Sequence, residues 1–87
     1  MGTKQQNVDV LLALGFTVEV DQGPEDGVFL DSPKNDPVYD MPVIQAYVYP
    51  NQAGTWSVDL DGGFKAPAFE NEELLIKHLD QYYPGWR

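Results

Sequence analysis

The stretch Pro42–Gly62, PVIQAYVYPNQAGTWSVDLDG, decides the fold because it predicts a β-hairpin. Aliphatic residues alternate with Gln and Tyr over Ile44–Tyr49, and apolar residues alternate with polar ones over Trp56–Leu60. Such alternation is typical of half-buried strands, whose successive side chains leave opposite faces. Pro50–Gly54 then forms a loop of five residues, a common hairpin length. The rest of the chain must pack against this hairpin or extend from it.

The alternation also predicts which side chains of the hairpin face the core. A register with Val48 opposite Trp56 sets one apolar residue against another at every inner position. Trp56 is therefore expected to anchor the core beneath one or both helices. Tyr47 and Tyr49 are expected on the other side, either as ordinary strand formers or as a surface that contacts a partner.

Two segments near the ends of the chain have the period of helices. The first covers Asn7–Leu14, with Lys4 as its earliest start and Asn7 as the expected cap, and Gly15 ends it. The second covers Glu70–Tyr82 and ends before a Pro-Gly pair. The aromatic residues that follow, up to Trp86, are either an anchor for this helix end or an exposed patch.

A second hairpin is predicted by Phe16–Asp21 and Val28–Leu30, joined by a turn rich in Gly, Pro, Asp and Glu. Regular alternation in the first of these strands would place Glu19 and Asp21 on the same face. Asp31–Met41 has no periodic pattern and is expected to be an exposed, irregular connection.

Together these segments predict a single α+β domain over residues 1–87. Its architecture is an antiparallel sheet of four to five strands, with the N-terminal and C-terminal helices packed on one face. The order is helix, four strands, an optional fifth strand over Phe64–Ala66, and helix.

Fourteen acidic residues against five basic ones give the chain a formal net charge of −9. Direct binding to nucleic acid or to anionic membranes is not expected, because both carry negative charge. The longest apolar run, Val10–Leu14, is far shorter than the ~20 residues of a membrane span, and no secretion signal is recognisable. With no cysteine in the chain, neither a disulfide nor a thiolate zinc site can form, and we expect a cytoplasmic protein.

Catalytic and metal-binding motifs are weak. His78 is the only histidine, and it is either a functional residue, as a general base or a metal ligand, or a half-buried residue of the second helix. Asp59–Glu70 resembles a calcium loop in its acidic positions, but Gly63 and Phe64 stand where that loop needs a ligand and a glycine. We therefore expect no enzyme activity, no cofactor and no metal.

The excess of acidic residues leads to the functional hypothesis. It serves solubility alone, or it forms a surface that docks on a basic partner, such as a nucleic-acid-binding protein whose groove would accept carboxylates in place of phosphates. In size, acidity and lack of cysteine the chain is similar to phage-encoded inhibitors of host nucleases and defence complexes. This likeness is one of type, and no motif names a family.

The expected function is thus that of a non-enzymatic inhibitor or adaptor that mimics nucleic acid. The alternative is a small structural or assembly protein that forms homodimers or larger oligomers through its sheet edge or its tyrosine face. The residues expected to bind the partner are Glu19, Asp21, Glu25, Asp26, Asp31, Asp36, Asp40, Tyr47 and Tyr49.

Overall fold

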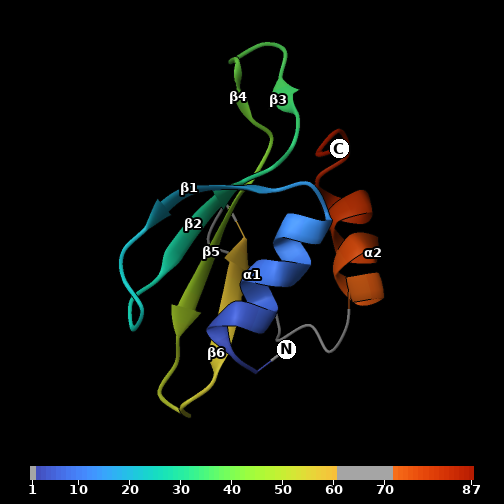
Figure 1. Cartoon of the computed structure of the whole chain (residues 1–87). Coiled ribbons are helices and arrows are strands. Elements are labelled where there is room, and N and C mark those ends of the chain that lie inside the picture. The colour runs from blue at the N-terminus through green and yellow to red at the C-terminus, as the bar shows by residue number, and fades with distance from the viewer. Residues whose placement is uncertain (1, 61–71) are drawn as a thin grey trace.

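The computed structural model describes residues 2–60 and 72–87 (Figure 1). Along the chain, the helices and strands are α1 (Lys4–Ala13), β1 (Thr17–Asp21), β2 (Val28–Asp31), β3 (Asn35–Asp36), β4 (Met41–Pro42), β5 (Gln45–Pro50), β6 (Trp56–Leu60) and α2 (Glu72–Tyr82). The expected fifth strand over Phe64–Ala66 and the expected first residues of the second helix lie outside the described residues.

The main sheet has four antiparallel strands in the order β1-β2-β5-β6, and both helices lie on one side of it (Figure 1). The side chains that fill the space between helices and sheet form one core. They are Val8 and Leu11 from α1, Leu75 and Leu79 from α2, Val28, Leu30, Ala46, Val48, Val58 and Leu60 from the strands, and Phe16, Ile44 and Trp86 from the connections and the C-terminal end. The predicted α+β architecture and order are confirmed.

The N-terminal helix begins at the earliest predicted residue because Thr3 caps it. The Thr3 side chain accepts a hydrogen bond from the Gln6 amide, and the Gln6 side chain accepts one from the Thr3 amide, which is a capping box. Asn7, the expected cap, is instead buried within the first turns, where its side chain donates to the carbonyls of Thr3 and Trp56. The helix ends as predicted, because Gly15 takes a left-handed φ of 96° that favours glycine.

The register of the β5–β6 hairpin differs by two residues from the predicted one. Val48 lies opposite Val58 instead of Trp56, and Pro50 pairs with Trp56. The cause is Asn51, whose Oδ1 accepts hydrogen bonds from the amides of Ala53 and Thr55, so that the five-residue loop runs from Asn51 to Thr55. A shift of two residues leaves every side chain on its predicted face, so the inner and outer faces are still correct.

The tryptophan at the centre of the core is Trp86, and the prediction that named Trp56 is wrong. Trp86 is 1% exposed, and its ring packs against Phe16 with centroids 5.8 Å apart. Its carbonyl accepts a hydrogen bond from the Lys34 amide, which ties the C-terminal segment to the chain that enters β3. The two-residue shift moves Trp56 to the end of β6, where it is half-buried and packs only at the margin of the core.

A β-bulge changes the faces of β1. Val18 pairs with Leu30, but the next pair is Val20 with Phe29, so Glu19 is an extra residue without a partner in β2. Because Phe29 faces away from the helices, Val20 does so too, and Asp21 turns back to the helix side. The expectation that Glu19 and Asp21 share a face is therefore wrong.

The stretch expected to be an irregular connection is in part ordered as a small hairpin. Strands β3 and β4 form a separate two-stranded sheet that projects from the end of the main sheet (Figure 1). Its turn is closed by the Asp40 amide, which donates to the Asp36 carbonyl at 2.8 Å. No helix within residues 2–60 and 72–87 is long and apolar enough to cross a membrane.

Candidate protein-binding face

The side of the main sheet that faces away from the helices carries a row of stacked aromatic rings; we call this side the outer face. Phe29 and Tyr47 are stacked with ring centroids 4.3 Å apart, and Tyr47 and Tyr49 follow at 5.6 Å. The rings lie there because Val28, Leu30, Ala46 and Val48 alternate with them and are buried on the inner side. Strand register thus brings residues from two hairpins into one aromatic ladder.

The position of the Tyr47 ring is set by a glycine. A Cβ atom added at Gly27 would lie 2.2 Å from Tyr47 Cε1, so the ring occupies the space that any other residue would fill. The Tyr47 hydroxyl also approaches Gln22 Oε1 at 3.4 Å. Since the ring is held between Phe29, Tyr49 and the backbone of Gly27, little conformational freedom is left to lose when a partner binds.

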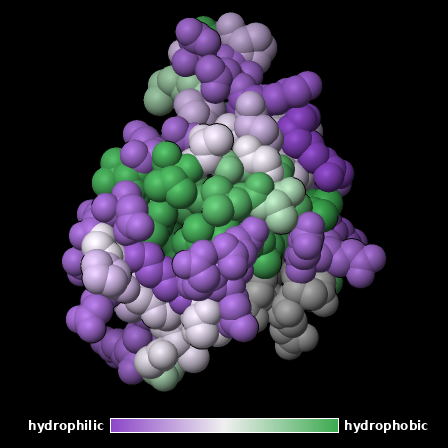
Figure 2. Space-filling model, in the orientation of Figure 1, coloured by the Kyte–Doolittle hydropathy of each residue, from purple (hydrophilic) through white to green (hydrophobic). Residues whose placement is uncertain are grey.

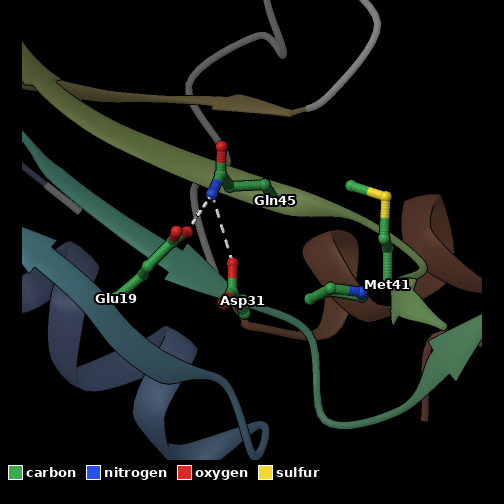
Figure 3. Close-up of a pocket in the computed structure, with 5 residues that line it drawn as sticks. Glu19, Asp31, Met41 and Gln45 are labelled. Carbon is green, nitrogen blue, oxygen red and sulfur yellow. Dashed lines mark hydrogen bonds between the residues drawn. The ribbon is translucent and has the colours of Figure 1, made fainter.

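A row of polar side chains lies next to the aromatic ladder, at the end of the sheet nearest β4 (Figure 3). Asp31 and Gln45 face each other across β2 and β5, and the bulge adds Glu19 from β1. Gln45 Nε2 donates to Asp31 Oδ1 at 3.2 Å and also to Glu19 Oε2. The three side chains, with Met41 and Pro42 from β4, line an open cleft of about 270 Å³.

The two carboxyl groups of this cleft influence each other. A hydrogen bond with the Asp31 carboxyl, repulsion from its charge and desolvation raise the pKa of Glu19 above its ordinary value of 4.5, although the Gln45 amide opposes the shift. The salt bridges among the described residues, Lys4–Asp21 and Arg87–Asp80, lie elsewhere. The cleft therefore holds acidic groups that no cation within the described residues compensates.

A further carboxylate borders the aromatic ladder on its opposite side. Asp59 in β6 lies directly opposite Tyr47, and its Oδ1 is buried without a hydrogen-bond partner among residues 2–60 and 72–87. The ladder thus has carboxylates on both sides, at Asp31 and at Asp59, and the outer face is both aromatic and negative.

The other acidic residues that the sequence singled out do not join this face. Asp21 points to the helix side and forms a salt bridge with Lys4 at 3.1 Å. A hydrogen bond from the Gly23 amide, and then the Lys4 ammonium, lower the pKa of Asp21. Glu25 and Asp26 are exposed in the turn between β1 and β2, where their charges extend the negative surface beyond the sheet.

Asp36 and Asp40 have a structural role in the β3–β4 hairpin. Asp36 Oδ1 accepts hydrogen bonds from the amides of Val38 and Tyr39 at 2.8 and 3.3 Å, and Asp40 adopts a left-handed φ of 52° that Asp tolerates better than most residues. The turn that they stabilise leaves Val38 79% and Tyr39 75% exposed. The hairpin therefore presents two apolar side chains at its tip.

Metal-binding geometry is not found in the described part of the chain. No three residues of the types His, Cys, Asp and Glu come together there as a group that could hold a metal ion. His78 packs against aromatic rings of the same helix end, 4.7 Å from the Tyr82 ring and 6.3 Å from the Tyr83 ring between centroids. Much of the calcium-loop pattern over Asp59–Glu70 lies outside the described residues.

Sequence reasoning missed Phe29 and Gly27 as contributors to the outer face, and it placed Gln45 on that face without counting it among the binding residues. The signal for Phe29 was present, since Val28 and Leu30 on either side of it alternate as inner residues. Gln45 could be assigned to the outer face, but its two acidic neighbours depend on sheet order and on the bulge. Comparisons with protein-family models, with curated proteins and with solved structures gave no match.

Proposed function

We propose that the chain is a non-enzymatic binding protein that docks on a basic partner through the outer face of its sheet. The observation that carries this proposal is the aromatic ladder of Phe29, Tyr47 and Tyr49, on a side of the sheet that neither helix covers. The carboxylates beside the ladder have no compensating cation among the described residues. Rigid aromatic side chains supply most of the contact energy in many interfaces, and charge complementarity supplies association rate and selectivity.

The proposed role is that of an inhibitor or adaptor of the small phage type, and the partner would be a nucleic-acid-binding protein. A formal charge of −9 on 87 residues supports this choice, because such a surface competes with phosphates for an electropositive groove. Within the proposed surface, the exposed carboxylates of Glu25 and Asp26 steer the approach, while Tyr47 makes the close contact.

The exposed tip of the β3–β4 hairpin would extend the contact. Val38 and Tyr39 are held in a fixed turn by Asp36, and an ordered apolar tip can enter a shallow pocket at small entropic cost. In the proposal Asp36 and Asp40 act through this turn and not as phosphate mimics.

The proposal is tested by capturing the partner on immobilised protein and measuring binding kinetics at about 50–500 mM salt. We expect a basic partner, loss of affinity as salt rises, and competition by duplex DNA or RNA. Glu25→Lys with Asp26→Lys should mainly slow association, whereas Tyr47→Ala should mainly speed dissociation. An acidic partner, or binding that does not change with salt, would contradict the proposal.

A second candidate function, self-assembly, is favoured by one observation at the edge of the sheet. Figure 2 shows hydrophobic residues gathered across the helix side of the molecule, over β1 and the neighbouring part of α1. Val18 in β1 and Leu12 in α1 are 46% and 44% exposed, and every residue of the edge strand β1 is exposed. The bulge and the charge of Glu19 oppose strand-to-strand pairing there. Sedimentation at increasing protein concentration separates the two functions, because only self-assembly predicts a dimer in the absence of a partner.

A further inference from the structure

The polar and aromatic rows of the outer face lie within reach of a single long side chain. Asp31 and Gln45 form one cross-strand pair, and Phe29 and Tyr47 form the pair two residues farther along the same strands. Two residues of a strand span about 6.6 Å, so an extended basic side chain can lie over the aromatic row with its head at the carboxylates.

The Gln45 amide shows which kind of group fits between the two carboxyl groups. Its planar nitrogen donates to both Glu19 and Asp31, the arrangement that a guanidinium N–H group makes with carboxylates. The open cleft beside this amide, about 270 Å³, falls below the ~300–1,000 Å³ of most small-molecule sites. Its size therefore suits one side chain better than a cofactor.

The walls of the cleft favour arginine over lysine. Met41 and Pro42 form an apolar wall facing the carboxylates, and Met41 is 62% exposed and open to contact (Figure 3). A guanidinium is planar and weakly hydrated, so it stacks on apolar and aromatic surfaces while it binds a carboxylate through two N–H groups. A lysine ammonium is strongly hydrated and gains little from such walls.

We infer that the outer face recognises arginine side chains, and that the segment it binds is an arginine-bearing stretch of the partner. This inference rests on the proposed function and deepens it by naming the chemistry of the partner's contact. The bound arginine lies with its stem on Phe29 and Tyr47 and its guanidinium between Glu19, Asp31 and the Met41–Pro42 wall.

The test uses the intact protein and two short synthetic peptides, in which glycine alternates with arginine or with lysine. Each peptide is titrated into isotopically labelled protein at about 50 mM salt, where screening is weak, and the shifts of amide resonances are followed. We expect the arginine peptide to bind about three- to tenfold more tightly than the lysine peptide, in line with a cation–π and stacking advantage. The largest shifts should include the side-chain amide of Gln45.

Two variants and a control locate the effect. Glu19→Gln should lower the affinity for the arginine peptide. Glu73→Gln, which removes the same charge from the exposed first turn of α2 on the helix side of the sheet, should change it much less. Met41→Ala leaves the core intact, because Met41 is exposed, and should reduce the preference for arginine without changing lysine binding. The dispersion of the amide spectrum confirms that each variant is folded.

Equal affinity for the two peptides, or equal loss from Glu19→Gln and Glu73→Gln, would overturn the inference and leave only general attraction to basic segments. The proposed function would survive that result, because it requires a basic partner and no preference for arginine. If neither peptide binds, the inference is also wrong, and the proposed function is then decided by the captured partner and its salt dependence.

Discussion

Trp86→Ala should remove a large part of the stability of this domain. The Trp86 side chain is 1% exposed, packs on Phe16 with centroids 5.8 Å apart, and donates from Nε1 to Asp80 Oδ1 at 2.9 Å. Replacing a buried tryptophan by alanine costs about 3–5 kcal/mol. A chain of 87 residues has a free energy of unfolding of about 4–13 kcal/mol, so the loss is a large part of the total. At 4–8 °C per kcal/mol, the melting temperature should fall by about 12–40 °C.

Thermal and urea unfolding followed by circular dichroism measure this effect, with two matched variants for comparison. Trp56→Ala removes the same side chain from a half-buried site and should cost only about 1–2 kcal/mol, since less apolar area leaves water there on folding. Trp86→Phe keeps an aromatic ring beside Phe16 and should fall between the two. If Trp86→Ala melts within a few degrees of the parent, or if Trp56→Ala is the more damaging change, the assignment of the core tryptophan is wrong.

Three further predictions concern local contacts. Asn51→Ala removes the side chain that organises the β5–β6 loop and should cost about 1–2 kcal/mol in urea unfolding; an unchanged midpoint would mean that the loop does not depend on it. Thr3→Ala breaks the capping box of α1 and should cost about 1 kcal/mol, with a loss of amide protection confined to the first turn; loss of protection throughout the sheet would refute a capping role. The raised pKa of Glu19 means that its contribution to stability is present below the ordinary value of 4.5 and is lost as pH rises through the folded-state value. As pH rises through that value, the Glu19→Gln variant should therefore gain stability relative to the parent, because the Asp31 carboxylate no longer repels a charge at this position. A difference in melting temperature that does not change with pH would argue against the interaction between Glu19 and Asp31.

The element types and their faces could be predicted from the sequence because both depend on local periodicity. The exposed and buried sides of β5 and β6 follow from alternation alone, and they survive the two-residue error in register. The register itself depends on where the loop closes, and that is decided by the several hydrogen bonds of one side chain, Asn51. The burial of Trp86 could not be predicted, because it follows a Pro-Gly break and its position depends on tertiary packing with Phe16.

The candidate site was predictable in part for the same reason. Tyr47 and Tyr49 were placed on the outer face by alternation, and the structure shows them there. The grouping of Glu19, Asp31 and Gln45 required the order of strands and the bulge in β1, and neither has a clear local signal. The charge of the two residues could not show that they lie on different faces. Glu19 lies on the outer face, whereas Asp21 forms a salt bridge with Lys4 on the helix side.

The bulge at Glu19 divides β1 into two segments that each pair regularly with β2. This division determines which changes in the length of β1 the sheet can accept. Deletion of Glu19 would restore regular pairing without moving any other residue to the opposite face, because Val18 would stay opposite Leu30 and Val20 opposite Phe29. Asp21 would stay opposite Val28 on the helix side, next to Lys4, and the outer face would lose one carboxylate. Loss of this one residue is therefore expected to change the charge of the outer face alone, whereas a second deletion within β1 would move the residues on one side of it to the opposite face.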